Sequence, residues 1–163
     1  MTAEEAARLV VDAMLGRLAR WLRALGYDTR YDANWDDVSL ARLARAEGRL
    51  LLTRDRQLAA RKGLHSLLVQ SDDLGQQLAE VLGRLGPPTA GAFGRCVICN
   101  VTLSELDRAS VEGRVPEYVW ETHEEFFLCR NCGRIYWRGT HWQQMVKRLR
   151  HLDGDDGEDA HRR

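Results

Sequence analysis

Two C-x-x-C pairs constrain the fold of this chain more than any other feature of its sequence. Cys96 and Cys99 form the first pair, and Cys129 and Cys132 form the second. Each pair offers two thiolates from one tight turn, so the four together predict a closed, tetrahedral zinc site of the structural kind. In a reducing compartment such pairs bind metal more often than they form disulfides. A redox pair and free buried thiols are the less favoured alternatives to structural Zn²⁺.

The first half of the chain alternates short apolar runs with helical patterns. This alternation is typical of an α/β unit, a parallel sheet flanked by helices. In the helical segment at 13–25, leucines share one face, and Arg17, Arg20 and Arg23 lie away from it. Asp37 is the expected N-cap of the segment at 38–47. We expect strands at residues 9–11, 27–31, 50–53 and 67–69, and helices at 13–25, 38–47, 56–62 and 73–85.

Composition divides the chain into three parts. Residues 1–90 hold the α/β unit, and a Gly- and Pro-rich linker at 86–91 leads into residues 91–152, which hold every cysteine. Residues 153–163 are rich in acids and lack large apolar side chains, so we expect a disordered acidic tail.

Charge and hydropathy exclude several classes of protein. The 24 basic and 24 acidic side chains cancel, and 44% of the residues are hydrophobic, which is ordinary for a soluble globular protein. No apolar run approaches the roughly 20 residues of a membrane-spanning helix. The acidic start of the chain lacks the order of a signal peptide. We therefore expect a cytoplasmic protein with no membrane contact.

Carboxylates follow the predicted strands of the first half. Asp12 ends the strand at 9–11, Asp55 follows the strand at 50–53, and Asp37 opens the helix between them. Parallel strands end on one edge of their sheet, where α/β proteins bind ligands. Each acid alone is adequately explained as a helix cap. Several together repel one another and favour a hard cation such as Mg²⁺ or Mn²⁺.

Longer motifs make the chain similar to a known family. Residues 11–23 (VDAMLGRLARWLR), residues 48–56 (GRLLLTRDR) and the two cysteine motifs at 95–100 and 129–142 resemble the Mut-seven C-terminal RNase domain family. The resemblance covers about residues 8–145. It implies a PIN-like nuclease domain at 1–90, followed by a small zinc ribbon with a basic and aromatic segment at 91–152.

The resemblance also implies the chemistry. It suggests a metal-dependent ribonuclease that prefers single-stranded RNA and leaves 5′-phosphate and 3′-hydroxyl ends. Its catalytic acids would be Asp12, Asp37 and Asp55, holding Mg²⁺ or Mn²⁺. Many relatives carry a further acid, which this sequence does not place. The candidates for additional acids are Asp36, Asp32, Asp72 and Asp73.

Cations and aromatics suggest where RNA would bind. The stretch between Glu125 and Asp153 contains no acid and interleaves arginines with aromatic side chains, on which bases can stack while the cations meet phosphates. The alternatives are that these aromatics pack the ribbon on the first domain and that the arginines of the first helix form a solvated face. The candidate RNA-binding residues are Arg17, Arg20, Arg54, Arg56, Arg134, Trp137, Arg138, His141 and Trp142.

A metal-dependent endoribonuclease that cuts single-stranded or looped RNA is the leading hypothesis. A toxin-like role would share this chemistry. From another class, a zinc-ribbon RNA-binding adaptor with an incomplete nuclease site is the main alternative. A phosphoacceptor domain is disfavoured, because no lysine follows the strand at 67–69.

Overall fold

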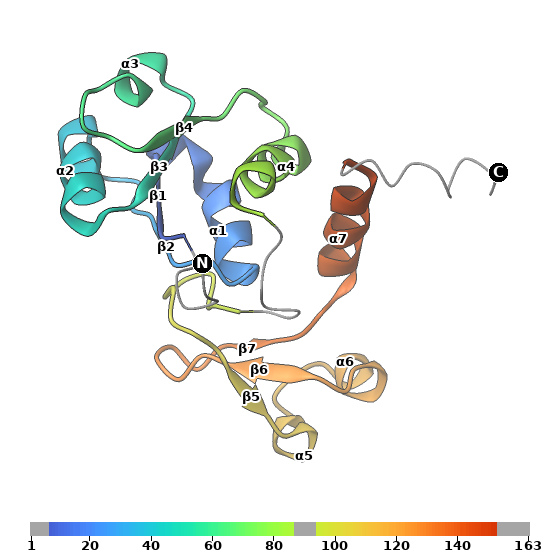
Figure 1. Cartoon of the computed structure of the whole chain (residues 1–163). Coiled ribbons are helices and arrows are strands. Elements are labelled where there is room, and N and C mark those ends of the chain that lie inside the picture. The colour runs from blue at the N-terminus through green and yellow to red at the C-terminus, as the bar shows by residue number, and fades with distance from the viewer. Residues whose placement is uncertain (1–6, 87–93, 153–163) are drawn as a thin grey trace.

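Four parallel strands in the order β2-β1-β3-β4 form the sheet of the first half (Figure 1). The computed structural model describes residues 7–86 and 94–152, with side chains as far as Leu149. Most of the predicted linker and the whole predicted tail lie outside the described residues. The strands are β1 (Leu9–Val11), β2 (Thr29–Arg30), β3 (Leu50–Thr53) and β4 (Ser66–Leu68).

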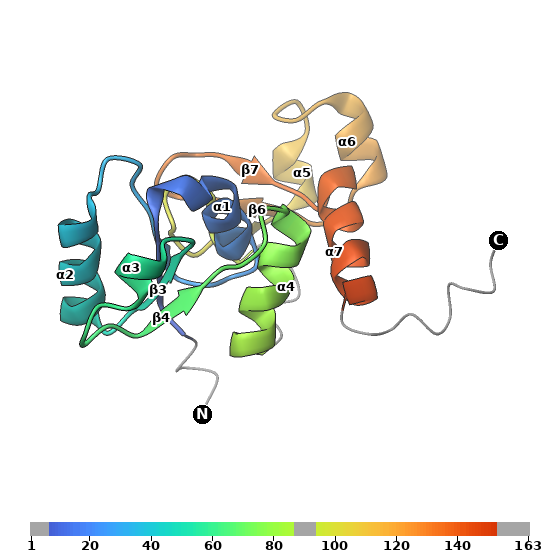
Figure 2. The same cartoon turned by 90° about the horizontal axis from the view of Figure 1, so that it is seen from above.

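Helices cover both faces of this sheet, because alternate residues of a strand point to opposite sides. Leu9 and Val11 join a buried cluster with α1 and α4, whereas Val10 packs with α2 and α3 on the other face. Figure 2 shows the two layers on either side of the strands. The α/β class and the predicted elements are confirmed, with ends that differ by a few residues. The helices are α1 (Gly16–Ala24), α2 (Asp37–Glu47), α3 (Arg56–Ala59) and α4 (Leu74–Leu85).

One predicted helix cap is wrong by one residue. Asp36, not Asp37, is the N-cap of α2, and its carboxylate accepts the backbone N–H of Ser39 at 2.8 Å. Asp36 has the extended backbone that a cap requires, whereas Asp37 is already the first helical residue. The Asp37 carboxylate is therefore left without a capping bond.

A small antiparallel sheet, in the order β5-β6-β7, lies in the second half of the chain. Its own core is small and consists of Val111, Val119 and Phe126, with partly buried neighbours. We call residues 94–139 the ribbon. Its elements are β5 (Ser104–Leu106), α5 (Arg108–Val111), α6 (Glu117–Thr122), β6 (Phe126–Leu128) and β7 (Ile135–Tyr136).

A last helix, α7 (Thr140–Leu152), leaves the ribbon and packs on the first half beside α4 (Figures 1 and 2). Trp142 stacks on Trp21 of α1, with ring centroids 5.9 Å apart and an angle of 22° between the planes. Leu149 is buried in the same core cluster as the sheet. Within the described residues, no helix combines the length and the apolar character that crossing a bilayer would need.

The ribbon also docks directly on the end of α1, through Arg23. The Arg23 guanidinium donates to the carbonyl of Thr29 at 2.8 Å and to the carbonyl of Val97 at 2.9 Å. The residue is only 8% exposed, so the expectation that it lies on a solvated face is wrong. Two ribbon residues that are distant in sequence, Val97 and Ile98, accept hydrogen bonds from Arg23 and contribute to its burial.

A second polar bridge lies next to Arg23. The Asn100 side chain accepts from the backbone N–H of Thr29 at 3.0 Å and donates to the Asp28 carboxylate at 2.8 Å. Arg49 pairs with the same carboxylate at 2.9 Å. Burial raises the pKa of Asp28, but the hydrogen bonds from Arg49 and Asn100 outweigh it, and the net pKa is lowered. Asp28 is therefore a charged structural anchor at the amino edge of the sheet.

Replacing Arg23 by Met should destabilise the chain by about 2–4 kcal/mol, because buried carbonyls lose charged donors and Met restores none of them. Urea unfolding of the zinc-loaded chain measures this. The matched control is Arg17→Met on the exposed side of the same helix, which we expect to change stability by less than about 0.5 kcal/mol. Equal midpoints for the two variants would contradict the bridging role.

Candidate active site and metal centre

Asp12 is the most buried acid at the carboxyl edge of the parallel sheet. It follows β1 directly and is 5% exposed. One carboxylate oxygen accepts the backbone N–H of Ala13 at 2.7 Å, which caps a single 3₁₀ turn, Ala13–Leu15. The other accepts the hydroxyl of Thr53 at 2.7 Å. Asp12 is therefore both a cap, as one reading of the sequence expected, and a buried carboxylate held in place by neutral donors.

Thr53 joins Asp12 to Asp55. Its hydroxyl donates to Asp12 and accepts the backbone N–H of Asp55 at 3.0 Å. The Asp55 carboxylate caps α3 by accepting the backbone N–H groups of Gln57 and Leu58 at 2.8 and 3.2 Å through one oxygen. The ends of β1 and β3 are adjacent because Val11 pairs with Leu52. One hydroxyl thus sets the position of two predicted catalytic acids, a role the sequence analysis did not give to Thr53.

Asp37 lies at the beginning of α2, which packs on β1 and β3 and then leads into β3. A helix that precedes a strand in this way runs against it, so its beginning lies at the carboxyl edge of the sheet. The Asp37 side chain is half-buried and makes no hydrogen bond or ion pair within the described residues. By contrast, hydrogen bonds from the backbone and side chain of Ser39 lower the pKa of Asp36.

The other candidate acids differ in their partners. Asp32 accepts the backbone N–H of Asn34 at 2.9 Å in the turn after β2. Asp73 caps α4 and pairs with Arg148 of α7, and this hydrogen bond lowers the pKa of Asp73. Asp72 is exposed and lines a shallow cavity near the start of α1. The Arg148 partner makes Asp73 the acid least free to meet a cation.

The four cysteines form a cluster that could hold a metal ion, with sulfur spacings that suit a tetrahedral zinc site. All four sulfur atoms lie within 4.8 Å of one another, and the sulfurs of Cys96 and Cys132 are 3.7 Å apart. Zinc–sulfur bonds of about 2.3 Å in a tetrahedron place sulfurs about 3.8 Å apart. Among the described residues no other group of three or more His, Cys, Asp or Glu side chains is gathered this closely. The acids at the sheet edge are therefore near one another in the fold without forming a preassembled cage.

Both cysteine turns have the same local structure. In each, the backbone N–H of the second cysteine points at the sulfur of the first, at 3.4 Å for Cys99 to Cys96 and 3.5 Å for Cys132 to Cys129. The residue after each pair has positive φ, 63° at Asn100 and 80° at Gly133. Asn and Gly tolerate this left-handed backbone best. The repeated turn is the local reason that each C-x-x-C pair presents both of its sulfurs to one cluster.

Polar neighbours surround the sulfurs. The Tyr136 hydroxyl lies 3.1 Å from the Cys96 sulfur, and the Asn131 amide donates to the Cys99 sulfur at 3.2 Å. The backbone N–H and then the side chain of Arg134 lower the pKa of Cys132 to about 6. Metal ligation requires thiolate, which these donors favour at Cys132. At Cys99 the Asn131 donor lowers the pKa, but burial and the neighbouring cysteines outweigh it and raise the pKa to about 11. Arg134, a candidate for RNA binding, is thus already engaged near the zinc site.

The remaining RNA-binding candidates lie at separate places in the structure. Arg54 and Arg56 are exposed beside Asp55, and Arg138 pairs with Glu125 at 3.3 Å. The others meet between α1 and α7, where Trp142 is nearly buried by its stack on Trp21 and supports the packing alternative. The residues at this second place are Arg17, Arg20, Trp137, His141 and Trp142.

A comparison with protein families agrees with this arrangement. The model of the Mut7-C RNAse domain matches residues 7–149, which include the acids, Thr53 and all four cysteines. The chain belongs to this family. Neither curated proteins nor solved structures gave a significant match. Membership in the Mut7-C family indicates a nuclease of the RNase type, and the cysteine site indicates a metal-binding protein.

Proposed function

We propose that this Mut7-C protein is a metal-dependent endoribonuclease that hydrolyses single-stranded or looped RNA, with the ribbon assisting RNA binding. The observation that carries the proposal is the buried Asp12, tied through Thr53 to Asp55 at the carboxyl edge of the sheet. Burying a carboxylate that is paired only with neutral donors costs stability. A nearby cation would repay that cost, which favours a functional role for the acid over a purely structural one.

The donors at this edge suit Mg²⁺ or Mn²⁺. They are oxygen atoms, the ligand type that these hard ions prefer. Asp12, Asp37 and Asp55 would hold the ion, and one Asp55 oxygen remains clear of the cap. When bound, such an ion lowers the pKa of water and offsets the charge that develops on a phosphodiester.

The protein side chains have their own parts in this mechanism. Thr53 orients Asp12, and the buried position of Asp12 in the backbone turn restricts its carboxylate. Exposed Arg54 and Arg56 lie next to Asp55, where they can bind the phosphates on either side of the cut. Hydrolysis would leave 5′-phosphate and 3′-hydroxyl ends. The unpaired thiols suit a reducing compartment, and we therefore place the protein in the cytoplasm.

The test is cleavage of end-labelled single-stranded RNA by the zinc-loaded chain, with and without added Mg²⁺ or Mn²⁺. We expect cleavage only with the added ion, and restoration after metal is removed and replaced. The ends of the products are identified by ligation and by phosphatase treatment. Cleavage at the same rate without either ion would overturn the metal dependence.

An RNA-binding adaptor with an incomplete nuclease site is the second candidate. One observation favours it: the acids at the sheet edge are not gathered into a tight group within the described residues. This function predicts RNA binding that needs zinc but survives loss of Asp12 or Asp55. Binding without cleavage of either single-stranded or looped RNA would select it.

A further inference from the structure

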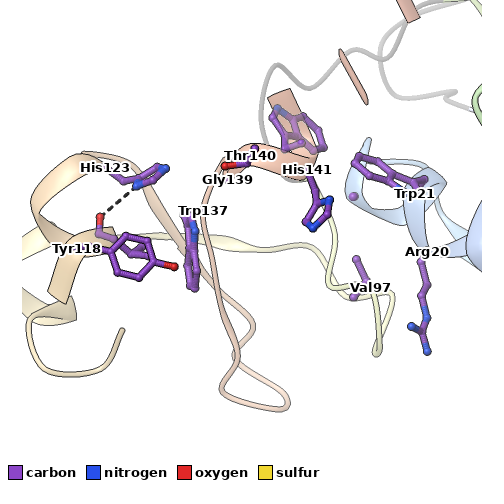
Figure 3. Close-up of a pocket in the computed structure, with 12 residues that line it drawn as sticks. Arg20, Trp21, Val97, Tyr118, His123, Trp137, Gly139, Thr140 and His141 are labelled. Carbon is purple, nitrogen blue, oxygen red and sulfur yellow. Dashed lines mark hydrogen bonds between the residues drawn. The ribbon is translucent and has the colours of Figure 1, made fainter. Parts of the chain in front are cut away.

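A cavity of about 540 Å³ lies between α1 and the ribbon (Figure 3). One wall comes from the ribbon and carries Tyr118 and Trp137, whose rings lie side by side in the figure. The opposite wall is Trp21 and Arg20 of α1, and His141 extends from α7 between the two walls. The catalytic mechanism uses none of these residues.

Tyr118 is the least expected member of this cavity. Tyr118 is 69% exposed. At this exposure, a large aromatic side chain gains little of the stabilising free energy that burial would give. Its neighbour Val119 is buried in the ribbon core, so α6 has a core side and presents Tyr118 on the other. The aromatic ring is therefore offered to the cavity rather than to the ribbon core.

Two neighbouring cavities, each sharing lining residues with the one before it, lie toward Asp12. Arg20, Trp21 and His141 also line a second cavity of about 660 Å³ between α1 and α7. Arg17 and Leu74 connect this one to a third, of about 290 Å³. The third contains Met14 and Leu15, which belong to the turn that Asp12 caps. We call these three neighbouring cavities, which share lining residues, the groove.

Charge changes along the groove. The first two cavities are lined by Arg17, Arg20 and Arg148 and by no acid. Arg148 is paired with Asp73, so the free cations are Arg17 and Arg20 within the described lining. An acid, Asp72, appears only in the third cavity, next to the predicted catalytic edge. Aromatics at one end, arginines in the middle and acids at the other end form an ordered series.

We propose that the groove binds one strand of RNA and that an unpaired base stacks against Tyr118 and Trp137, away from the site of cleavage. Stacking on aromatic side chains with nearby arginines on the phosphates is how single strands are bound without reading sequence. In a duplex the bases are stacked inside and cannot enter such a cavity. The inference rests on the proposed function, because it gives the ribbon its part in holding substrate.

The proposal is tested by binding, apart from cleavage. The zinc-loaded Asp12→Asn chain, without Mg²⁺ or Mn²⁺, is titrated with fluorescent single-stranded RNAs of increasing length and with a duplex. Affinity should rise with length and then level off, and the duplex should bind weakly. Tyr118→Ala should weaken single-strand binding about 5- to 100-fold. Tyr118→Phe, which keeps the ring, should restore it, and Arg42→Gln on α2 is the control for a lost surface charge.

Photocrosslinking of the same RNA locates the base. Crosslinks to the peptides that contain Tyr118 and Trp137 would support the groove, whereas crosslinks confined to α2 and α3 would overturn it. Unchanged affinity in both Tyr118→Ala and Arg20→Gln would overturn it as well, even if the wild-type chain cleaves RNA. Tyr118-dependent binding by a chain that never cleaves would support the groove and replace the nuclease by the adaptor.

Discussion

Asp12→Asn should lower the rate of RNA cleavage by at least about 100-fold, the range expected when a group that acts on the reacting centre is removed. The amide is neutral, so it contributes no charge toward Mg²⁺ or Mn²⁺. The fold should survive, because the amide oxygen can still accept from Ala13 while the amide nitrogen donates to the Thr53 hydroxyl. Loss of rate without loss of fold is the result that separates a catalytic carboxylate from a helix cap.

Single-turnover cleavage of end-labelled RNA measures this, with urea unfolding of each chain alongside. The control is Asp107→Asn, which removes an exposed acid that begins α5 and makes no side-chain capping bond. Its cleavage rate should equal that of the parent chain. If Asp12→Asn cut RNA as fast as the parent, the nuclease edge would be misplaced.

Thr53 supplies a companion variant for the same prediction. Thr53→Val keeps the shape but removes the hydroxyl that contacts Asp12 and the backbone of Asp55, so cleavage should fall about 10- to 100-fold. Because Thr53 acts through the acids, the Mn²⁺ concentration needed for half-maximal rate should rise. Thr53→Ser should restore both values. A uniform loss of folded protein would lower the rate without moving the Mn²⁺ requirement.

Local patterns made the sheet and the cluster of four cysteines predictable. An apolar run that ends in an acid, as at Val11 and Asp12, gives both the strand and the position of the carboxylate. The C-x-x-C turns are equally local, since each needs only its own residues and one position of positive φ. Most of what the sequence supplied has its cause within a few residues, although the cap of α2, which is also local, was placed one residue too late.

Two of the features that were missed have causes distant in the chain. Arg23 looks like its helix neighbours Arg17 and Arg20, but it donates to the carbonyl of Thr29 and to carbonyls of the ribbon, which are distant in sequence. Tyr118 lines a cavity whose opposite wall is α1, an arrangement that no local pattern around Tyr118 predicts. The sequence does indicate helix α7, because Trp142, Met145 and Leu149 recur at helical spacing. The aromatic and basic residues of the same segment also favour RNA binding, and the sequence analysis gave them that interpretation.

Losing zinc should unfold the ribbon while the parallel sheet stays folded. Four thiolates can contribute about 10–16 kcal/mol of zinc-binding free energy, which here supports a core as small as Val111, Val119 and Phe126. The parallel sheet has its own buried clusters on both faces. Cys129→Ser, which removes a buried ligand, should therefore remove protection from hydrogen exchange at β5–β7 and keep it at β1 and β3.

Metal analysis and hydrogen exchange check this result, with Ser110→Ala, an exposed site in the same ribbon, as the control that should retain one zinc per chain. Stoichiometric zinc and unchanged β6 protection in Cys129→Ser would contradict the structural role of the ion.

The kinetic consequence follows from where the two sites lie. Asp12, Thr53 and Asp55 remain on the intact sheet, whereas Tyr118 and Trp137 are lost with the ribbon. Cys129→Ser should therefore raise KM for RNA more than it lowers kcat, the opposite of what Asp12→Asn does.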